Sequence, residues 1–163
     1  MSAALEHKID IQARLNELHR VPEEAMWAGA PNAWVRALSP SAVGTIGEAL
    51  ALKVLGGTAT KNNTIGYDID LDGKRIEVKL STVVMSNGYP ILRWRQIRPN
   101  DPYTHICFIA VYPHKARMFL VPKEAIPNEV LKHQHGRGQS LDLFHIHARR
   151  IDTLFPWMVA HEV

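Results

Sequence analysis

The chain has 163 residues, a formal charge of +3 and one cysteine. This length suits one compact domain that buries roughly 70% of its unfolded surface, and the lone Cys107 excludes an internal disulfide framework. No stretch approaches the roughly 18 apolar residues of a transmembrane helix, and the amino terminus lacks a signal-peptide core, so we expect a cytoplasmic protein without membrane contacts.

The first 40 residues predict two helices. LEHKIDIQARLNELHR has the apolar spacing of an amphipathic helix. Pro22 stands where a second helix, EEAMWAGA, can begin.

A third helix is predicted over PSAVGTIGEALALKVLGG, closed by the pair Gly56-Gly57. Its recurring apolar positions are Ile46, Leu50 and Val54. Glu48 follows Gly47, a residue that permits close approach of other groups. Glu48 is therefore either a carboxylate of a functional site or an exposed helix glutamate.

The run GYDIDLDGKRIEVKL predicts a β-hairpin that turns at Asp72-Gly73. A two-residue loop pairs Ile69 with Ile76 and carries the register to Asp68 opposite Glu77. Because side chains alternate between faces, one face is apolar: Ile69, Leu71, Ile76 and Val78. The other face is almost wholly charged: Asp68, Asp70, Arg75, Glu77 and Lys79.

Two neighbouring carboxylates repel each other unless a cation lies between them or one takes up a proton. Mg²⁺ fits Asp68 and Glu77, because it prefers hard oxygen ligands and often takes only one or two protein carboxylates. Lys79 would lie on the same face, where an amine can orient a water molecule or stabilise charge on a phosphate. This combination describes metal-assisted phosphodiester hydrolysis; the alternative is a surface hairpin with ordinary cross-strand salt bridges.

Further strands are predicted near residues 91–97, 105–112 and 117–121, in addition to hairpin strands near 67–71 and 75–81. In the segment ILRWRQIRP the alternation puts Gln96 on the face with Trp94, which makes Gln96 a candidate polar group at the edge of the site. ICFIAVY reads as a buried strand that contains Cys107. EAIPNEVLKHQ predicts a short or broken helix, because Pro127 interrupts it.

These motifs resemble those of the PD-(D/E)XK nuclease superfamily, which includes type II restriction endonucleases, junction resolvases and repair nucleases. The resemblance lies in GYDID followed by EVK, preceded by a GxxGE helix, and covers about residues 41–125. It implies an α/β, restriction-endonuclease-like single domain with a central mixed sheet of about five strands flanked by helices. The domain would comprise amino-terminal helices (1–40), a catalytic core (41–125) and a basic, His-rich region (126–163).

The resemblance also implies roles for individual residues. Asp68 matches the first acid, and Glu77 and Lys79 match the (D/E)XK pair. Asp68, Glu77 and the main-chain carbonyl of Val78 would bind one or two Mg²⁺. Glu48 matches the acid that many members carry on the helix, and Gln96 matches a glutamine found in some members.

The sequence departs from the pattern in having Tyr67 where the family often has proline. Asp70 is a rival for the first acid, and the hairpin register favours Asp68.

Cations are concentrated in the second half of the chain: residues 91–163 carry 10 Lys and Arg against 6 Asp and Glu. Such residues either contact phosphates or form ordinary solvated surface. The candidate DNA-binding residues are Arg93, Arg95, Arg98, Arg137, Arg149 and Arg150. The pairs His133/His135 and His145/His147 are compatible with zinc, but further ligands at characteristic spacing are missing, which favours surface roles.

We therefore expect a homodimeric, Mg²⁺-dependent type II restriction endonuclease that cuts duplex DNA at a specific sequence. A dimer is expected because cutting two strands requires two centres and a chain of this length offers one. The alternatives are a structure-selective repair or junction nuclease, an RNA-cleaving toxin domain and a non-catalytic DNA-binding module.

Overall fold

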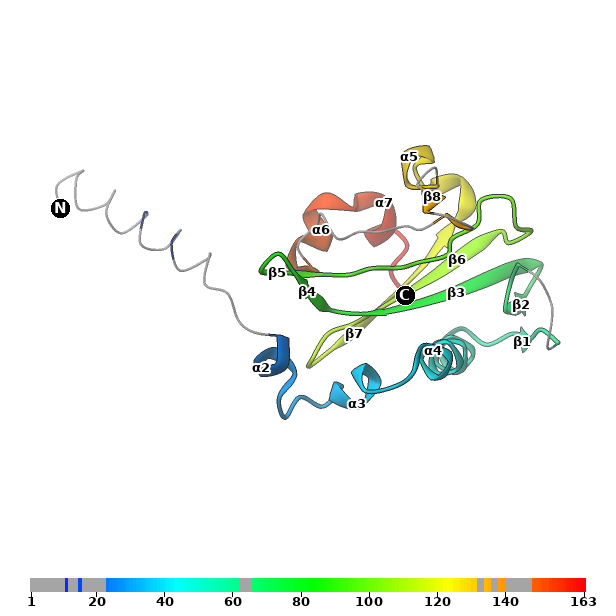
Figure 1. The fold of residues 1–163 in the computed structure, drawn as a ribbon. Helices are drawn as coiled ribbons and strands as arrows, with labels where there is room; N and C mark the ends of the chain where they lie inside the picture. Colours follow the sequence, from blue (N-terminus) through cyan, green and yellow to red (C-terminus); the bar gives the residue numbers. More distant parts are fainter. Residues whose placement is uncertain are drawn as a thin grey trace.

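The computed structural model describes residues 23–61, 66–131 and 148–163, together with Ile11, Leu15, Gln134–His135 and Gly138–Gln139. Its centre is a five-stranded mixed sheet with the strand order β1-β2-β3-β6-β7 (Figure 1). These strands are β1 (Thr58–Ala59), β2 (Ile69–Leu71), β3 (Lys74–Thr82), β6 (His105–Val111) and β7 (Ala116–Pro122). β3 and β6 run parallel, and the other neighbouring strands run antiparallel.

Helices flank this sheet on both sides, which confirms the α/β class. Helix α4 (Pro40–Leu55) lies on one side, and α6 (Ile151–Leu154) and α7 (Pro156–Val159) lie on the other (Figure 1). The remaining elements are α2 (Glu23–Trp27), α3 (Ala33–Arg36), β4 (Val84–Ser86), β5 (Tyr89–Ile91), η1 (Lys123–Ala125), α5 (Asn128–Leu131), β8 (Gln134–His135), β9 (Gly138–Gln139) and η2 (Ala148–Arg150).

The predicted hairpin is confirmed at its turn and in its strands. Asp72 and Gly73 both have positive φ, 46° and 81°, as a tight two-residue hairpin loop requires. Ile69 pairs with Ile76, and both are fully buried. The apolar face of the hairpin therefore belongs to the core, as the alternation predicts.

Helix α4 was also predicted correctly, but its buried stripe was not. Ser39 caps the helix by accepting a hydrogen bond from the main-chain N–H of Ala42, and Gly56 and Gly57 end it with positive φ. The helix buries its small residues Gly47 and Ala51, whereas Val54 is exposed. The larger apolar residues flank the contact line because the helix lies close against β3.

The strand predicted over residues 91–97 is wrong. β5 ends at Ile91 and pairs with β4 in a separate hairpin, and residues 92–98 form no regular element. Trp94 decides this conformation, because its fully buried ring packs against Phe108 at 5.3 Å and its Nε1 donates to the carbonyl of Ile109. The fifth strand of the sheet is instead β1, which the sequence analysis did not predict.

β6 is the centre of the core. All its residues after His105 are buried, including Cys107, as the run ICFIAVY predicts. The carboxyl-terminal residues then extend along β7: Leu120 N–H donates to His161, and Val163 N–H donates to Met118.

Three further predictions concern the ends of the chain. EEAMWAGA begins with helix α2, and EAIPNEVLKHQ is broken at Pro127 into η1 and α5. The first predicted helix lies outside the described residues, apart from Ile11 and Leu15, which are helical. None of the described helices combines the length and apolarity needed to cross a membrane.

Candidate active site

The candidate site lies where β2 and β3 separate. Their ladder ends at the pair Ile69–Ile76. β3 continues to Thr82 with β6 on its other side. Within the described part of the chain, the β2-side edge of β3 is therefore unpaired by any strand from Glu77 onward.

Asp68 occupies this fork. Its main-chain N–H donates to the carbonyl of Ile76 at 2.8 Å, and its Oδ2 accepts from the N–H of Val78 at 2.8 Å. The predicted cross-strand pair of Asp68 with Glu77 is therefore wrong. The side-chain carboxylate of Asp68, and not a main-chain carbonyl of β2, accepts the next hydrogen bond from β3. The N–H and C=O of one strand residue point to the same side, so the Val78 carbonyl also faces the open edge.

Glu77 and Lys79 share a face of β3, as predicted. Glu77 Oε1 lies 2.7 Å from Lys79 Nζ, and their side chains are only 17% and 18% exposed. Their register partners on β6 are Ile106 and Phe108, so the ion pair lies against an apolar strand. Such surroundings strengthen electrostatic interactions by reducing contact with water.

Helix α4 carries Glu48 on the side of the fork, although Glu48 is itself an exposed helix residue. A Cβ atom added to Gly47 would lie 3.2 Å from the Leu80 Cβ, so the helix backbone rests almost directly on β3. Glu48, the next residue, has its pKa raised first by partial burial of its carboxyl and then by the charge of Glu77. The positive charge of Lys79 lowers the pKa of Glu48.

The two acids of the fork show the same effect. Burial is the main cause that raises the pKa of Asp68, and the charge of Glu48 adds to it. Burial likewise raises the pKa of Glu77, against the lowering effect of Lys79, and the charges of Asp68 and Asp101 contribute. The site therefore holds several carboxylates in each other's fields with one amine among them, an arrangement that a bound cation would stabilise.

The donor set suits a hard cation. Among residues 23–61, 66–131 and 148–163, no three His, Cys, Asp or Glu side chains are grouped closely enough to hold a metal ion. The predicted set consists of two carboxylates and the Val78 carbonyl, all oxygen donors, and Mg²⁺ commonly completes its coordination with water and phosphate oxygens. The residues at the fork thus fit Mg²⁺ and would not suit a softer ion that prefers sulfur or imidazole ligands.

The other predicted site residues are placed less centrally. Asp70 pairs with Thr58 of β1 and is exposed, so Asp68 is the better first acid. Gln96 is exposed, lies outside any strand and has a positive φ of 60°. The structure therefore does not place Gln96 on the strand that its predicted role requires.

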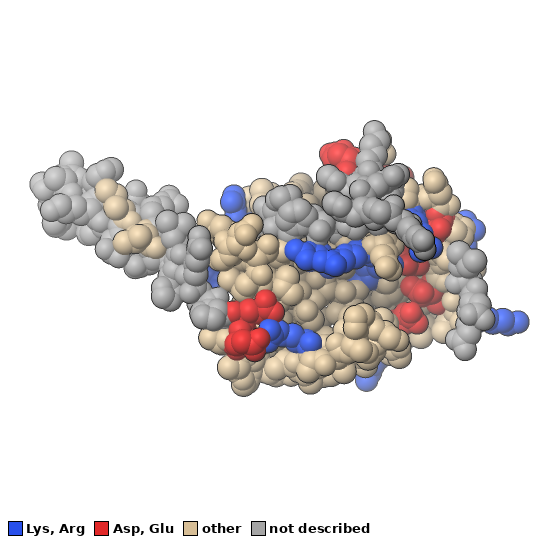
Figure 2. Space-filling model, in the orientation of Figure 1, with Lys and Arg blue, Asp and Glu red and all other residues tan. Residues whose placement is uncertain are grey.

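Cations lie beside the acidic site. Figure 2 shows two acidic groups on one face, one near α2 and one over β3, with a row of lysine and arginine atoms between them. The segment 92–98 is anchored to β3 by the N–H of Arg93, which donates to Ser81 Oγ at 2.9 Å. Arg93 is half-buried. The four exposed candidate arginines are Arg95, Arg98, Arg149 and Arg150. Arg137, the side chain of His135 and the other histidines of the two pairs lie outside the described residues.

The segment that leads into β6 also borders the site, and no sequence pattern predicted this. Gly66, just before the fork, rests on this segment, because a Cβ there would lie 2.4 Å from Pro102 and 3.1 Å from Asp101. The pKa of Tyr103 is raised to about 12 by burial and by the charges of Asp101 and Glu77. No periodic pattern marks these residues, because they belong to no helix or strand.

No protein-family model and no curated protein sequence matches this chain. A function is therefore inferred from the geometry of the fork and from the resemblance of its motif.

Proposed function

We propose that the protein is a Mg²⁺-dependent endonuclease with a restriction-endonuclease-like fold that hydrolyses phosphodiester bonds of duplex DNA. The observation that carries this proposal is the fork itself. Asp68 reaches across to Val78, and the Glu77–Lys79 pair stands on the same open stretch of β3. Carboxylates, a carbonyl and an amine thus converge where a phosphate can approach the edge of the sheet.

Asp68, Glu77 and the Val78 carbonyl would hold one or two Mg²⁺. Asp68 keeps its second oxygen for this purpose, because Oδ2 accepts from Val78. When bound, Mg²⁺ supplies charge stabilisation at the phosphate and a lower pKa for coordinated water. Glu48 would hold water molecules around the cation, and Gln96 would do so only after a local rearrangement.

Lys79 would position the attacking water and stabilise the charge that develops on the phosphate. Its ammonium is already held within 2.7 Å of a carboxylate of the site. The water oxygen would bond to phosphorus while the bond to the 3′ oxygen breaks, which leaves a 3′ hydroxyl and a 5′ phosphate. Positioned groups of this kind contribute typically 10²–10⁴-fold in rate.

The neighbouring cations would hold the DNA. Arg95 and Arg98 are exposed on the anchored segment 92–98, and η2 presents Arg149 and Arg150 next to β5. Arg93 and Arg137 complete the proposed set. Phosphate contacts of this type orient a duplex without reading its sequence, and a homodimer would supply the second centre that double-strand cutting requires.

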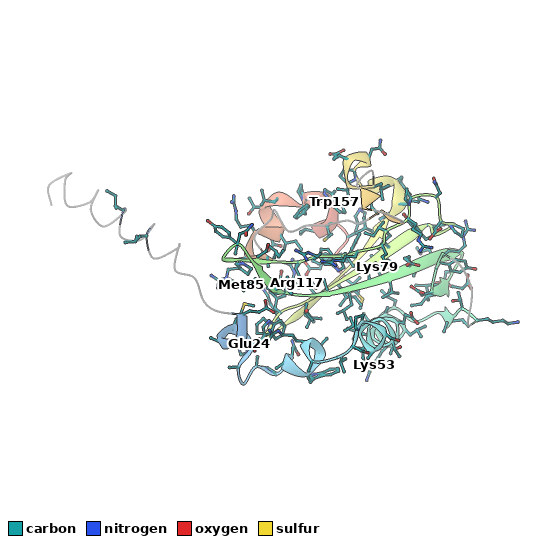
Figure 3. All side chains as sticks on the ribbon, viewed as in Figure 1. Glu24, Lys53, Lys79, Met85, Arg117 and Trp157 are labelled. Carbon is teal, nitrogen blue, oxygen red and sulfur yellow. The ribbon has the colours of Figure 1, made fainter. Side chains whose placement is uncertain are left out.

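The decisive variant is Lys79→Ala. We expect plasmid cleavage in Mg²⁺ to fall by at least about 10²-fold while DNA binding persists. Lys53→Ala is the matched control, because Lys53 projects from α4 away from the sheet (Figure 3). It should cut at the wild-type rate. A Lys79→Ala protein that cuts as fast as the wild type would falsify the role assigned to this amine.

The substrate class is tested with the wild type. Discrete plasmid fragments with 5′ phosphate ends support a sequence-specific restriction activity. Cleavage of branched DNA alone indicates a junction or repair nuclease, and degradation of tRNA with intact plasmid indicates an RNA-cleaving enzyme. Binding without any cleavage in Mg²⁺ would identify a DNA-binding module and exclude the proposed reaction.

A further inference from the structure

Tyr103 carries a buried hydroxyl that has no hydrogen-bond partner among the described residues. The residue is 3% exposed, and its hydroxyl oxygen is shielded from solvent. A buried polar group without a partner is unfavourable and therefore uncommon in folded proteins. The position consequently calls for an explanation.

The surroundings of Tyr103 hold it beside the fork. The next residue, Thr104, donates its N–H to the carbonyl of Arg75 at 2.8 Å, two residues before Glu77. The Nζ atom of Lys123 lies 4.2 Å from the Tyr103 ring centroid and donates to the main-chain carbonyl of Asp101 at 2.8 Å. The ammonium that lies over the ring is thus itself held by the chain just before Tyr103.

The hydroxyl is too deeply buried to contact a substrate, so an acceptor inside the protein would be needed to satisfy it. Burial raises the pKa of Tyr103 most, and the charges of Asp101 and Glu77 raise it further, so these are the acids in its surroundings. Glu77 Oε1 is bound by Lys79 at 2.7 Å in this structure. Lys79 has to turn toward water or phosphate during the proposed reaction, and Glu77 then loses a donor.

We propose that Tyr103 is a positioning residue that donates a hydrogen bond to the Glu77 carboxylate when Glu77 binds the metal and Lys79 turns to the phosphate. The inference rests on the proposed function, because it assigns a role within the same site. Groups that orient a metal ligand typically change metal affinity by 10–100-fold when they are removed.

Tyr103→Phe tests the proposal through two measurements on the full chain: thermal unfolding without Mg²⁺, and the Mg²⁺ concentration that gives half of the maximal stabilisation. Phenylalanine keeps the ring under Lys123 and removes only the unpartnered hydroxyl. We expect a melting temperature no lower than that of the wild type, and a half-saturating Mg²⁺ concentration raised by about 10–100-fold.

Tyr112→Phe is the matched control. The Tyr112 hydroxyl is also buried, but it donates to the carbonyl of Ala148 at 2.8 Å. Its removal should lower the melting temperature by about 2–4 °C and leave the Mg²⁺ dependence unchanged. The two tyrosines thus give opposite patterns.

Each remaining outcome contradicts the proposal. An unchanged Mg²⁺ dependence of Tyr103→Phe, with Mg²⁺ still stabilising the wild type, refutes the role of Tyr103 and leaves the proposed function intact. A lower melting temperature of Tyr103→Phe without Mg²⁺ shows that the hydroxyl has a structural partner. A wild type that neither gains stability from Mg²⁺ nor cleaves DNA overturns the proposed function together with this role.

Discussion

Asp68 is the residue at which stability and the proposed activity are in conflict. Its half-buried carboxylate lies in the field of Glu48, and both effects raise its pKa. A raised pKa means that ionisation of Asp68 destabilises the folded state. A binding site for a cation is expected to carry such a cost while the cation is absent.

We expect Asp68→Asn to stabilise the metal-free protein at pH 8 by about 0.5–2 kcal/mol. The folded state holds the Asp68 proton more tightly than the unfolded chain, so wild-type stability falls as pH rises from the unfolded pKa of about 3.9 through the raised folded value. The advantage of asparagine, which can still accept from Val78, should therefore vanish below about pH 4. Urea denaturation across this pH range measures the difference.

Asp70→Asn is the control for this prediction. Asp70 lies in β2, two residues after Asp68 in the chain, but is exposed, and its replacement should change stability by no more than about 0.5 kcal/mol. If Asp68→Asn is destabilising at pH 8, the inference that the ionised Asp68 carboxylate destabilises the folded protein is wrong.

Mg²⁺ should reverse the sign of the Asp68 effect. At 100 times its dissociation constant, a cation that binds only the folded state stabilises it by about 2.7 kcal/mol. The wild type should gain this stability when Mg²⁺ is added, whereas Mg²⁺ should stabilise the Asp68→Asn variant much less. Thermal unfolding with Mg²⁺, and with K⁺ at equal ionic strength, distinguishes binding from general screening.

At the scale of elements, the site depends on how closely α4 approaches β3. Gly47 has only 3.2 Å between its added Cβ and the Leu80 Cβ, whereas a Cβ on Gly44 of the same helix would meet no atom within 4 Å. Glu48 follows Gly47 directly, so any displacement of the helix displaces a carboxylate of the site. The glycine at this position therefore determines how closely α4, and with it Glu48, approaches β3.

Two alanine substitutions separate helix propensity from packing. Gly44→Ala should stabilise the protein by about 0.5–1 kcal/mol, because alanine favours the helix interior. Gly47→Ala should gain nothing or lose stability, because its methyl group has to push α4 or Leu80 aside. Chemical denaturation measures both, and plasmid cleavage should decrease only for Gly47→Ala. Equal stabilisation by both variants would show that the contact is not restrictive.

At the scale of the whole molecule, acidic and cationic groups occupy adjacent parts of one face (Figure 2). The carboxylates gather at the fork, whereas Arg95 and Arg98 stand on the segment 92–98 that passes beside it. This division would suit the proposed nucleic acid partner, with one region for a cation and the other for phosphates.

The salt dependence of DNA binding tests this division. In the Lys79→Ala background, replacing both Arg95 and Arg98 by alanine should reduce the slope of log K against log salt by about 0.9 per lost phosphate contact. Lys53→Ala should leave the slope unchanged, because Lys53 lies on α4 on the side away from the sheet (Figure 3). Fluorescence anisotropy at several salt concentrations provides the measurement. An unchanged slope in the double variant would remove segment 92–98 from the DNA interface.

Local chemistry explains which features the sequence could predict. Asp72-Gly73 and the alternation around it predict the hairpin, because turn geometry and side-chain period are local properties. The same alternation failed at residues 92–98, where Trp94 is fully buried through contacts with the distant strand β6. Sequence periodicity could not anticipate that Asp68 would leave the ladder to cap Val78, because that contact exists only after β2 and β3 separate.

The last few residues limit how copies of this protein can associate. The main chain of His161 and Val163 occupies hydrogen-bonding groups of β7, and Arg117 holds the tail through Glu162 at 2.7 Å. One border of the sheet is thereby closed to strand addition. At the opposite border β1 is only two residues long, so the proposed dimer is expected to form through helices or loops and not through a continuous intermolecular sheet.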